Sequence, residues 1–323
     1  MALTRDMARE LVEAQLGAGP WEVRPFGAGK FSQTFEAEGP PGAYVLRVAP
    51  PDALLQLFYE YRMMRQEPAI HARLRAETTV PVPEIVAHDF SRERVDRDYL
   101  LMPRLAGEPL NEAALGPAER MRALGQWGGF VAQAHELTDP DNRFGYLGAH
   151  HCMEPRASWP AAFRVMWAKE LDDIVGCGVY DRATADATAA LLDEHLPAFE
   201  HCTTSRLLHG DLWVTNLLVA PDGTATGLLD WDRACWGDVE WDLAIAEYCG
   251  VTGTSFWEGY GRRVYRGEGD AAIRRMFYLL YEHQKYIVIS MSSRRYDPAG
   301  ARAYARQCLA MMEQFRRTGR PEF

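Results

Sequence analysis

The chain has 323 residues, of which 47% are hydrophobic and 25% charged, a composition typical of a soluble globular protein. Its formal net charge of −10 argues against a nucleic-acid-binding protein, which would carry a basic face, and against attachment to an anionic membrane surface. The six cysteines are scattered without a CxxC pair, which excludes the usual spacing of a zinc ribbon or a small disulfide-rich fold.

The N-terminal segment, MALTRDMARELVEAQLGAG, has helical periodicity with charges throughout and lacks the apolar stretch of a signal peptide. No uncharged apolar run elsewhere reaches the length needed to cross a bilayer. We therefore expect a cytoplasmic protein with reduced thiols that contacts no membrane and no nucleic acid.

Strand-like stretches dominate before about residue 105. WEVRPFGAGKFSQTFEAE and AYVLRVA are predicted strands around glycine turns, and VPVPEIVAHDF and RDYLLMPRLAGEPL indicate two more. Between them, YEYRMMRQEPAIHARLRA predicts a helix that is interrupted or begins near Pro68.

Helical spacing of apolar residues dominates after residue 105, in segments 117–138, 161–174, 183–199 and 271–315. The pattern predicts an α+β protein of two lobes. Residues 1–104 would form a small β-rich lobe, and residues 105–323 a larger helical lobe.

The segment LLHGDLWVTN places Asp211 two residues after His209 and five before Asn216. It is followed by the apolar run LLVA, the turn PDGT and a second apolar run ending in LLDWD. Two short strands joined by a turn would bring Asp230 back beside Asn216. Because Mg²⁺ prefers oxygen ligands, a carboxylate and an amide suit a magnesium site, and Asp211 would remain to orient or deprotonate a hydroxyl.

The pattern HGDxxxxN followed by LLDWD and GDVEWDLA closely resembles the aminoglycoside phosphotransferase and choline kinase family of small-molecule kinases, which share the protein-kinase-like fold. Gly210 stands where a protein kinase has arginine. The resemblance covers most of the chain from about residue 20 and implies an α+β bilobal architecture. Residues 1–104 would then be the nucleotide-binding lobe, and residues 105–323 the lobe with the catalytic loop, the metal site and the acceptor site.

The resemblance also implies roles for individual residues. Asp211 would be the catalytic base, supported by His209 as a scaffold residue of the loop. Asn216 and Asp230 would bind magnesium, with Asp232 as a neighbouring acid. Isolated acids of this kind also occur as turn or helix-capping residues, so it is the combination of motifs that carries the assignment.

A candidate phosphate-binding turn lies between two predicted strands, with Gly27, Gly29, Lys30 and Ser32 as its cofactor-binding candidates. It is not a Walker A loop, and it does not pass into a helix as a dinucleotide-binding fingerprint would. A plain hairpin turn is the alternative interpretation.

Arg47 occupies the position at which the resembled family has a lysine that pairs the nucleotide phosphates. Its partner acid is expected on the following helix, with Glu67 as the first candidate and Glu60 in reserve. The segment from Tyr99 to Leu105 resembles the strand and hinge between the lobes, whose backbone would face a purine, and Met102 is the predicted contact residue. A buried apolar strand without this contact is the alternative interpretation.

These observations predict an O-phosphotransferase that uses ATP or GTP with Mg²⁺ and acts on a small hydroxylated, and in part cationic, molecule. The resemblance favours an antibiotic as acceptor. A metabolic kinase acting on fructosamines, sugars or amino alcohols is the alternative, since HGDLW also resembles the fructosamine kinases. A third hypothesis is a nucleotide-binding protein without turnover, which only Arg47 favours. Acids and aromatic residues downstream of the metal segment are compositional candidates for the acceptor site (Asp238, Glu240, Glu247, Glu258, Trp236, Trp241, Trp257, Tyr260).

Overall fold

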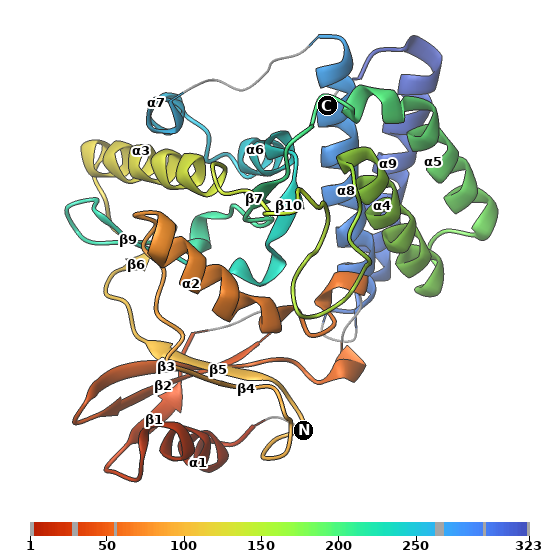
Figure 1. Ribbon diagram of the computed structural model, residues 1–323. Coiled ribbons are helices and arrows are strands. Elements are labelled where there is room, and N and C mark those ends of the chain that lie inside the picture. Colours follow the sequence, from red (N-terminus) through yellow and green to blue (C-terminus); the bar gives the residue numbers. More distant parts are fainter. Residues whose placement is uncertain (1–2, 28–31, 55–56, 262–267, 293–294, 322–323) are drawn as a thin grey trace.

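A computed structural model describes residues 3–27, 32–54, 57–261, 268–292 and 295–321. An antiparallel sheet built from the N-terminal segments lies against a larger, mainly helical part, so the predicted α+β architecture is confirmed. Figure 1 shows the sheet at the bottom, the helical part above it, and helix α2 between the two.

The sheet has five strands in the order β1-β2-β3-β5-β4 (β1, Glu22–Pro25; β2, Gln33–Gly39; β3, Gly42–Val48; β4, Ala87–Asp89; β5, Tyr99–Pro103). Helix α1 (Arg5–Leu16), which Thr4 caps at its N-terminus, packs on one face. Leu11, Trp21, Phe35 and Leu46 belong to the apolar cluster between the helix and the sheet. Strand β5 is buried on both faces, because Leu101 packs in the cluster with α1 while Leu100 and Met102 pack in a cluster on the other side of the sheet.

Helix α2 (Glu67–Glu77) has Pro68 in its first turn, so the predicted start near Pro68 is confirmed. It follows three short 3-10 turns (Asp52–Leu54, Phe58–Glu60, Met63–Gln66). Its apolar residues Ile70 and Leu74 pack in the same cluster as Trp127 of the helical part. The division of the chain after residue 104 remains a prediction, and this packing places a segment from before residue 104 in the core of the second part.

The helical part contains seven further helices among the described residues (α3, Pro117–Ala134; α4, Trp159–Gly176; α5, Arg182–His195; α6, Val239–Tyr248; α7, Thr254–Tyr260; α8, Asp270–Met291; α9, Pro298–Thr318) and the 3-10 turn Leu196–Phe199. The predicted helices at 117–138, 161–174 and 183–199 are therefore confirmed. The predicted helical segment 271–315 is two helices, because Asp297 caps and Pro298 opens α9.

Two small sheets carry the HGD motif and the segment ending in DWD. One pairs β7 (Arg206–Leu208) with β10 (Cys235–Gly237), and the other has the order β6-β8-β9 (β6, Glu108–Pro109; β8, Leu217–Val219; β9, Ala225–Leu228). Leu217 lies opposite Leu228, and the backbone N–H of Leu229 donates to the backbone oxygen of Asn216 at 2.8 Å. The predicted hairpin is therefore confirmed, and it brings Asp230 back to Asn216.

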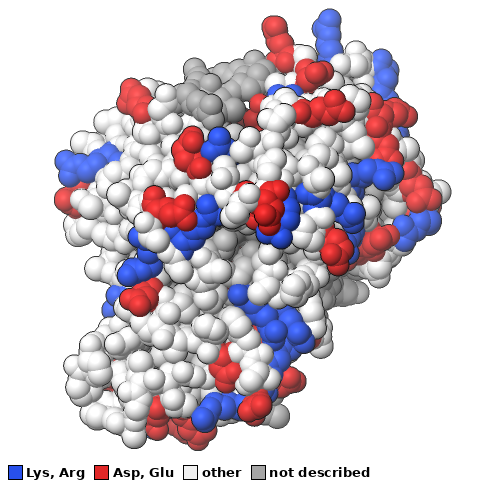
Figure 2. All heavy atoms as spheres, viewed as in Figure 1, with Lys and Arg blue, Asp and Glu red and all other residues white. Residues whose placement is uncertain are grey.

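Helices α3 and α7 of the helical part pack closely against each other. A Cβ atom at Gly259 would lie 1.8 Å from the Gly125 oxygen, so only glycine allows this contact. Within the described ranges, no helix is both long and apolar enough to span a membrane. Figure 2 shows acidic and basic side chains interspersed over the face viewed in Figure 1.

Candidate active site

The buried carboxylate of Asp242 on α6 holds the loop that follows β7. Asp242 accepts hydrogen bonds from the backbone N–H of His209 at 2.6 Å and of Gly210 at 2.8 Å, and from His135 Nε2 at 3.1 Å. Burial by itself would raise the pKa of Asp242. These hydrogen bonds lower the pKa by a larger amount, so the net shift is downward. An ionised acid therefore fixes the two residues that precede Asp211.

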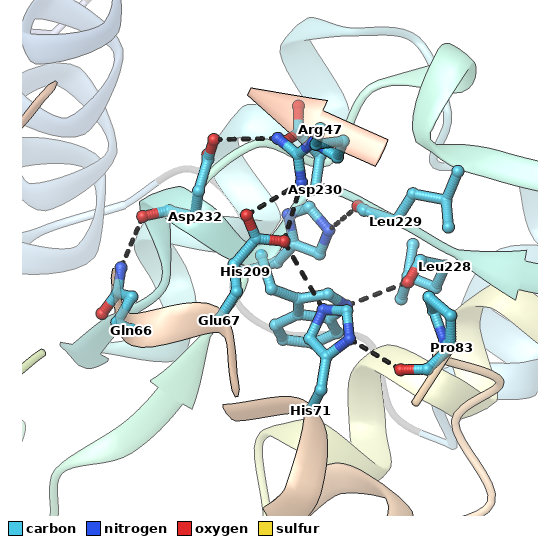
Figure 3. Close-up of polar contacts among 11 residues, drawn as sticks. Arg47, Gln66, Glu67, His71, Pro83, His209, Leu228, Leu229, Asp230 and Asp232 are labelled. Carbon is cyan, nitrogen blue, oxygen red and sulfur yellow. Dashed lines mark hydrogen bonds and ion pairs between the residues drawn. The ribbon is translucent and has the colours of Figure 1, made fainter. Parts of the chain in front are cut away.

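His209 connects this loop to the end of β9. Its Nδ1 accepts from the Asp211 N–H at 3.2 Å, so the proton of a neutral ring is on Nε2, which donates to the Leu229 oxygen at 2.9 Å. Figure 3 shows this contact behind Asp230. His209 is thus bonded to backbone on both sides, a placement that suits the predicted scaffold role.

Gly210 adopts a φ of +78°, and a Cβ atom there would lie 2.5 Å from the Arg233 backbone oxygen. Both the left-handed conformation and this close contact require glycine. The structure therefore gives a physical reason for glycine at the position where protein kinases have arginine.

Asp211 and Asn216 lie on opposite sides of one tight loop. Asn216 Nδ2 donates to the Asp211 backbone oxygen at 3.0 Å and to Oδ2 of its side chain at 3.3 Å. The amide nitrogen thus faces Asp211, which turns the amide oxygen to the other side. The side chain of Asp211 remains partly accessible, with 39% of its surface exposed.

Asp230 and Asp232 flank Trp231 directly after the β8–β9 hairpin. Asp230 has a φ of +68° and a ψ of +58°, a left-handed conformation that few residues other than glycine adopt. Such backbone strain occurs preferentially at functional sites. Asp232 is buried. Its burial is the main cause, and the negative charge of Asp230 the second cause, of a carboxyl pKa well above the usual value.

Arg47 joins strand β3 to both acids of this segment (Figure 3). Its Nη1 contacts Glu67 Oε1 at 2.8 Å and Oε2 at 2.7 Å, while Nη2 contacts Asp230 at 2.7 Å and Asp232 at 3.2 Å. Burial lowers the pKa of this guanidinium, but the three carboxylates raise it more. Glu67 of α2 is thus the acid that pairs with Arg47, whereas the reserve candidate Glu60 caps its own turn by accepting from the Leu57 N–H.

The charges around Arg47 suit a divalent cation. Three acidic side chains, those of Glu67, Asp230 and Asp232, face one guanidinium. Burial, with the charge of Asp230 contributing, raises the pKa of Glu67 to about 7 and that of Asp232 well above its usual value, and a bound cation would relieve this crowding of acids. Hard cations such as Mg²⁺ bind carboxylate and amide oxygens. Asn216, Asp230 and Asp232 supply donors of this type, so the predicted metal ligands fit the ion.

Two of the predicted phosphate-binding residues are described. Gly27 has a φ of +69°, which places a left-handed turn after β1, and Ser32 lies just before β2. Ser32 and Asp232 line the same small hollow, of about 10 Å³, between the sheet and the DWD segment. Gly29 and Lys30 lie outside the described residues.

Met102 points into a small apolar cluster with Ala49, Met64 and Leu100, on the sheet face opposite α1. It pairs with Val45, and the Arg104 N–H donates to the Ala43 oxygen two residues along the same ladder. Alternation in an antiparallel pair therefore turns the Met102 backbone toward β3. The predicted contact of Met102 with a purine then depends on its side chain, because its backbone groups face the neighbouring strand.

Most of the acids and aromatic residues considered for the acceptor site have structural partners. Glu240 is paired with Arg274, Glu247 with Arg275, and Asp238 accepts from Tyr278, while Tyr260 bonds His135. Trp236, Trp241 and Trp257 are buried, and only Glu258 is exposed. The structural interpretation of these residues is therefore favoured over an acceptor role.

Sequence reasoning missed the charged residues behind Asp211. Arg233 forms two bonds with Glu282 of α8, and Lys285 lies between Glu282 and Asp211. The signal was present in LLYEHQKYIVISM, where two charges three residues apart interrupt an otherwise apolar helix. Charges on the buried face of a helix require partners, which only the tertiary structure identifies.

A larger hollow, of about 850 Å³, lies between α4, α5 and the loop after α5, and its lining includes Ser158, Arg164, Asp193 and Cys202. None of the predicted site residues lines it. Its size alone does not connect it to the chemistry of the Asp211 loop.

Comparison with known proteins matches residues 22–277 to the model of a family described as "Phosphotransferase enzyme family". A Vibrio cholerae relative named "Probable ketoamine kinase" is 31% identical over 195 residues, which is 58% of this chain and 61% of the relative. The alignment thus spans less than two thirds of that protein.

Two solved structures share the fold. A Haemophilus somnus protein assigned as a fructosamine-3-kinase has a TM-score of 0.64 at 18% identity, over 93% of this chain and 96% of that one. Aminoglycoside phosphotransferase APH(4)-Ia, in a ternary complex with ADP and hygromycin B, has a TM-score of 0.62 at 21% identity, over 94% and 97%.

Proposed function

The chain belongs to the phosphotransferase enzyme family, and from this premise we propose that it is a small-molecule kinase that transfers the γ-phosphoryl group of ATP to a hydroxyl group of a ketoamine. The observation that carries the proposal is the convergence of Asp211, Asn216, Asp230 and Arg47 at the junction of the sheet and the helical part. These are the groups that phosphoryl transfer needs for positioning and for charge stabilisation.

In this proposal, Asp211 accepts a hydrogen bond from the acceptor hydroxyl and takes its proton as the oxygen bonds to the γ-phosphorus and the bond to the leaving ADP oxygen breaks. Asn216 and Asp230 hold Mg²⁺, with Asp232 beside them. The bound ion would stabilise negative charge on the phosphoryl group. Arg47, kept in place by Glu67, has an Nη2 group that can turn from the two aspartates to a phosphate oxygen.

A ketoamine is favoured as the acceptor by the comparisons with known proteins. The Vibrio cholerae relative and the Haemophilus somnus structure are both named for this substrate class. The antibiotic that the sequence favoured is therefore replaced by the metabolic alternative.

The non-catalytic alternative loses its one supporting feature. Arg47 was the departure that favoured it, and in the structure Arg47 pairs with the acid of α2 as the lysine was expected to do. The proximity of Asn216 to Asp211, and of the residue before Asp230 to Asn216, supports turnover.

The test is ADP release from Mg-ATP in the presence of a ketoamine, made by condensing glucose with lysine, and separately with free lysine, glucose and hygromycin B. We expect release with the ketoamine only, and a product heavier by one phosphoryl group in mass spectrometry. Asp211→Asn should bind Mg-ATP normally and lose about 10²-fold to 10⁴-fold in turnover, the range for a general base. Release with hygromycin B and none with the ketoamine would contradict the proposed acceptor.

A further inference from the structure

Lys285 of helix α8 is a nearly buried cation next to the proposed catalytic base. Only 7% of the residue is exposed. Its Nζ lies 2.6 Å from Glu282 Oε2 and 3.9 Å from Asp211 Oδ1. A buried ammonium group needs charged partners, because its transfer from water is otherwise costly. Glu282 and Asp211 are thus the two carboxylates that can stabilise the charge of Lys285.

Glu282 is fully bonded without Lys285. Its carboxylate accepts two hydrogen bonds from Arg233, at 3.0 and 2.8 Å, and a third from Trp241 Nε1 at 3.1 Å. Arg233 also donates to the backbone oxygen of Gly210, in the loop that carries Asp211. Neutralising Glu282 therefore does not by itself explain why a lysine is buried here.

The charge count of this cluster gives the explanation. Arg233 and Lys285 carry two positive charges, and Glu282 carries one negative charge, so one positive charge is in excess. Asp211 supplies the second negative charge. Burial lowers the pKa of Lys285, but Glu282 and Asp211 raise it by more, which keeps the ammonium group charged.

The distance between Lys285 and Asp211 is as informative as the charge. At 3.9 Å the two groups attract each other beyond hydrogen-bond distance, so Oδ1 keeps its lone pairs for an acceptor hydroxyl. Asn216 holds Oδ2 from the other side at 3.3 Å. The carboxylate is thereby oriented from two sides without being blocked.

The composition of the chain supports a specific need for lysine here. The chain contains only three lysines, Lys30, Lys169 and Lys285, among its 35 basic residues. A guanidinium group would present a planar fork that binds a carboxylate through two hydrogen bonds, whereas an ammonium group acts as a compact point charge. An arginine would therefore tend to occupy the oxygens that Lys285 leaves accessible.

We propose that Lys285, held by Glu282 and Arg233, is a positioning residue that orients the Asp211 carboxylate toward the acceptor hydroxyl. The proposal rests on the proposed function, because the orientation of Asp211 matters for phosphoryl transfer. It adds a residue of helix α8 to those that act in the reaction, although α8 contains none of the loop motifs.

The experiment compares Lys285→Met and Lys285→Arg in the full chain, with Lys169→Met as the matched control on α4. We expect Lys285→Met to lower kcat about 100-fold, the cost of misplacing a reacting group by about 1 Å, with an unchanged KM for Mg-ATP. Lys285→Arg, which keeps the charge, should lie between Lys285→Met and the unmodified protein. Lys169→Met should keep the original kcat.

A purely structural role makes different predictions. It would lower the melting temperature and the amount of folded enzyme while leaving kcat per folded molecule unchanged. Unchanged kcat in folded Lys285→Met would overturn the proposal.

A crystal structure of Lys285→Met provides a reading that needs no acceptor. We expect the Asp211 carboxylate to rotate away from the position that Lys285 and Asn216 define. A carboxylate in the original position would contradict the inference. If the unmodified protein is silent on every ketoamine, the proposed acceptor fails, whereas this crystallographic result still decides the role of Lys285.

Discussion

The guanidinium group of Arg47 lies 2.7 Å from Asp230 Oδ1, although 183 residues separate the two positions in the chain. The same group contacts Glu67 on the helix between them. One side chain thus connects the sheet, helix α2 and the proposed metal segment. This connection helps to hold the proposed nucleotide-binding sheet against the proposed metal ligands.

Replacing Arg47 by alanine should both destabilise the protein and weaken nucleotide binding. It would leave Glu67 buried without its cation, and breaking a buried ion pair from one side costs about 3–5 kcal/mol. Arg47→Lys keeps the charge but has no planar fork, so we expect a smaller loss of stability. Urea unfolding and titration with Mg-ATP measure the two effects. Alanine and lysine variants that both bind Mg-ATP normally would remove the phosphate-binding role.

Asp230→Ala should abolish the dependence of nucleotide binding on magnesium. The side chain is 39% exposed and its carboxylate is one of the proposed ligands, so its loss removes a negative donor without opening the core. Calorimetric titration of ATP with and without Mg²⁺ measures the change. Asp222→Ala, at an exposed acid in the turn between β8 and β9, is the control that should keep the dependence. A magnesium effect that persists in Asp230→Ala would contradict the ligand assignment.

Gly210→Ala should unfold or inactivate the protein, whereas Gly250→Ala should be tolerated. Both positions have positive φ, +78° and +69°, so both variants incur the left-handed penalty of about 1–2 kcal/mol. Only Gly210 would also place its Cβ 2.5 Å from a backbone oxygen, that of Arg233. Melting temperatures of the two variants isolate this steric contribution. Equal melting temperatures would show that the loop relaxes.

Glu170→Gln should stabilise the protein at alkaline pH. Glu170 is buried, and neither carboxylate oxygen has a hydrogen-bond partner among the described residues. Burial, and then the nearby Glu282, raise its pKa well above the ordinary 4.5. The native state therefore keeps its proton to higher pH than the unfolded state, and stability decreases as pH rises above 4.5, by at most about 1.4 kcal/mol per pH unit.

The glutamine variant lacks this titration. Its melting temperature should exceed that of the unmodified protein at pH 8 and approach it near pH 5. Glu194→Gln, on the exposed face of α5, should follow the unmodified protein at both values. Parallel curves for the unmodified protein and Glu170→Gln would show that Glu170 is not protonated in the native state.

Local features of the sequence predicted most of the secondary structure. The helices α3, α4 and α5 follow from apolar spacing, the start of α2 from Pro68, and the β8–β9 hairpin from two apolar runs around PDGT. The hairpin explains why Asn216 and Asp230 could be placed together in advance. Only 14 residues separate them, and one turn closes that distance.

Predictions that depended on packing between distant segments were less complete. Periodicity indicated one long helical stretch at 271–315, but Asp297 and Pro298 divide it. The strand at Met102 was predicted, yet the direction of its backbone depends on the register with β3. Acids such as Glu240 suggested an acceptor site, whereas Arg274 from another helix pairs with it.

The sequence by itself determined the fold class, the local elements and the motif that relates the chain to its family, because turns, caps and apolar periodicity act over a few tens of residues. Only the tertiary structure decided that Arg47 pairs with Glu67 and Asp230, and that Lys285 lies beside Asp211. Buried charges must find partners wherever the packed core brings them. The pairing of such charges is a property of the whole fold, which no single stretch of sequence contains.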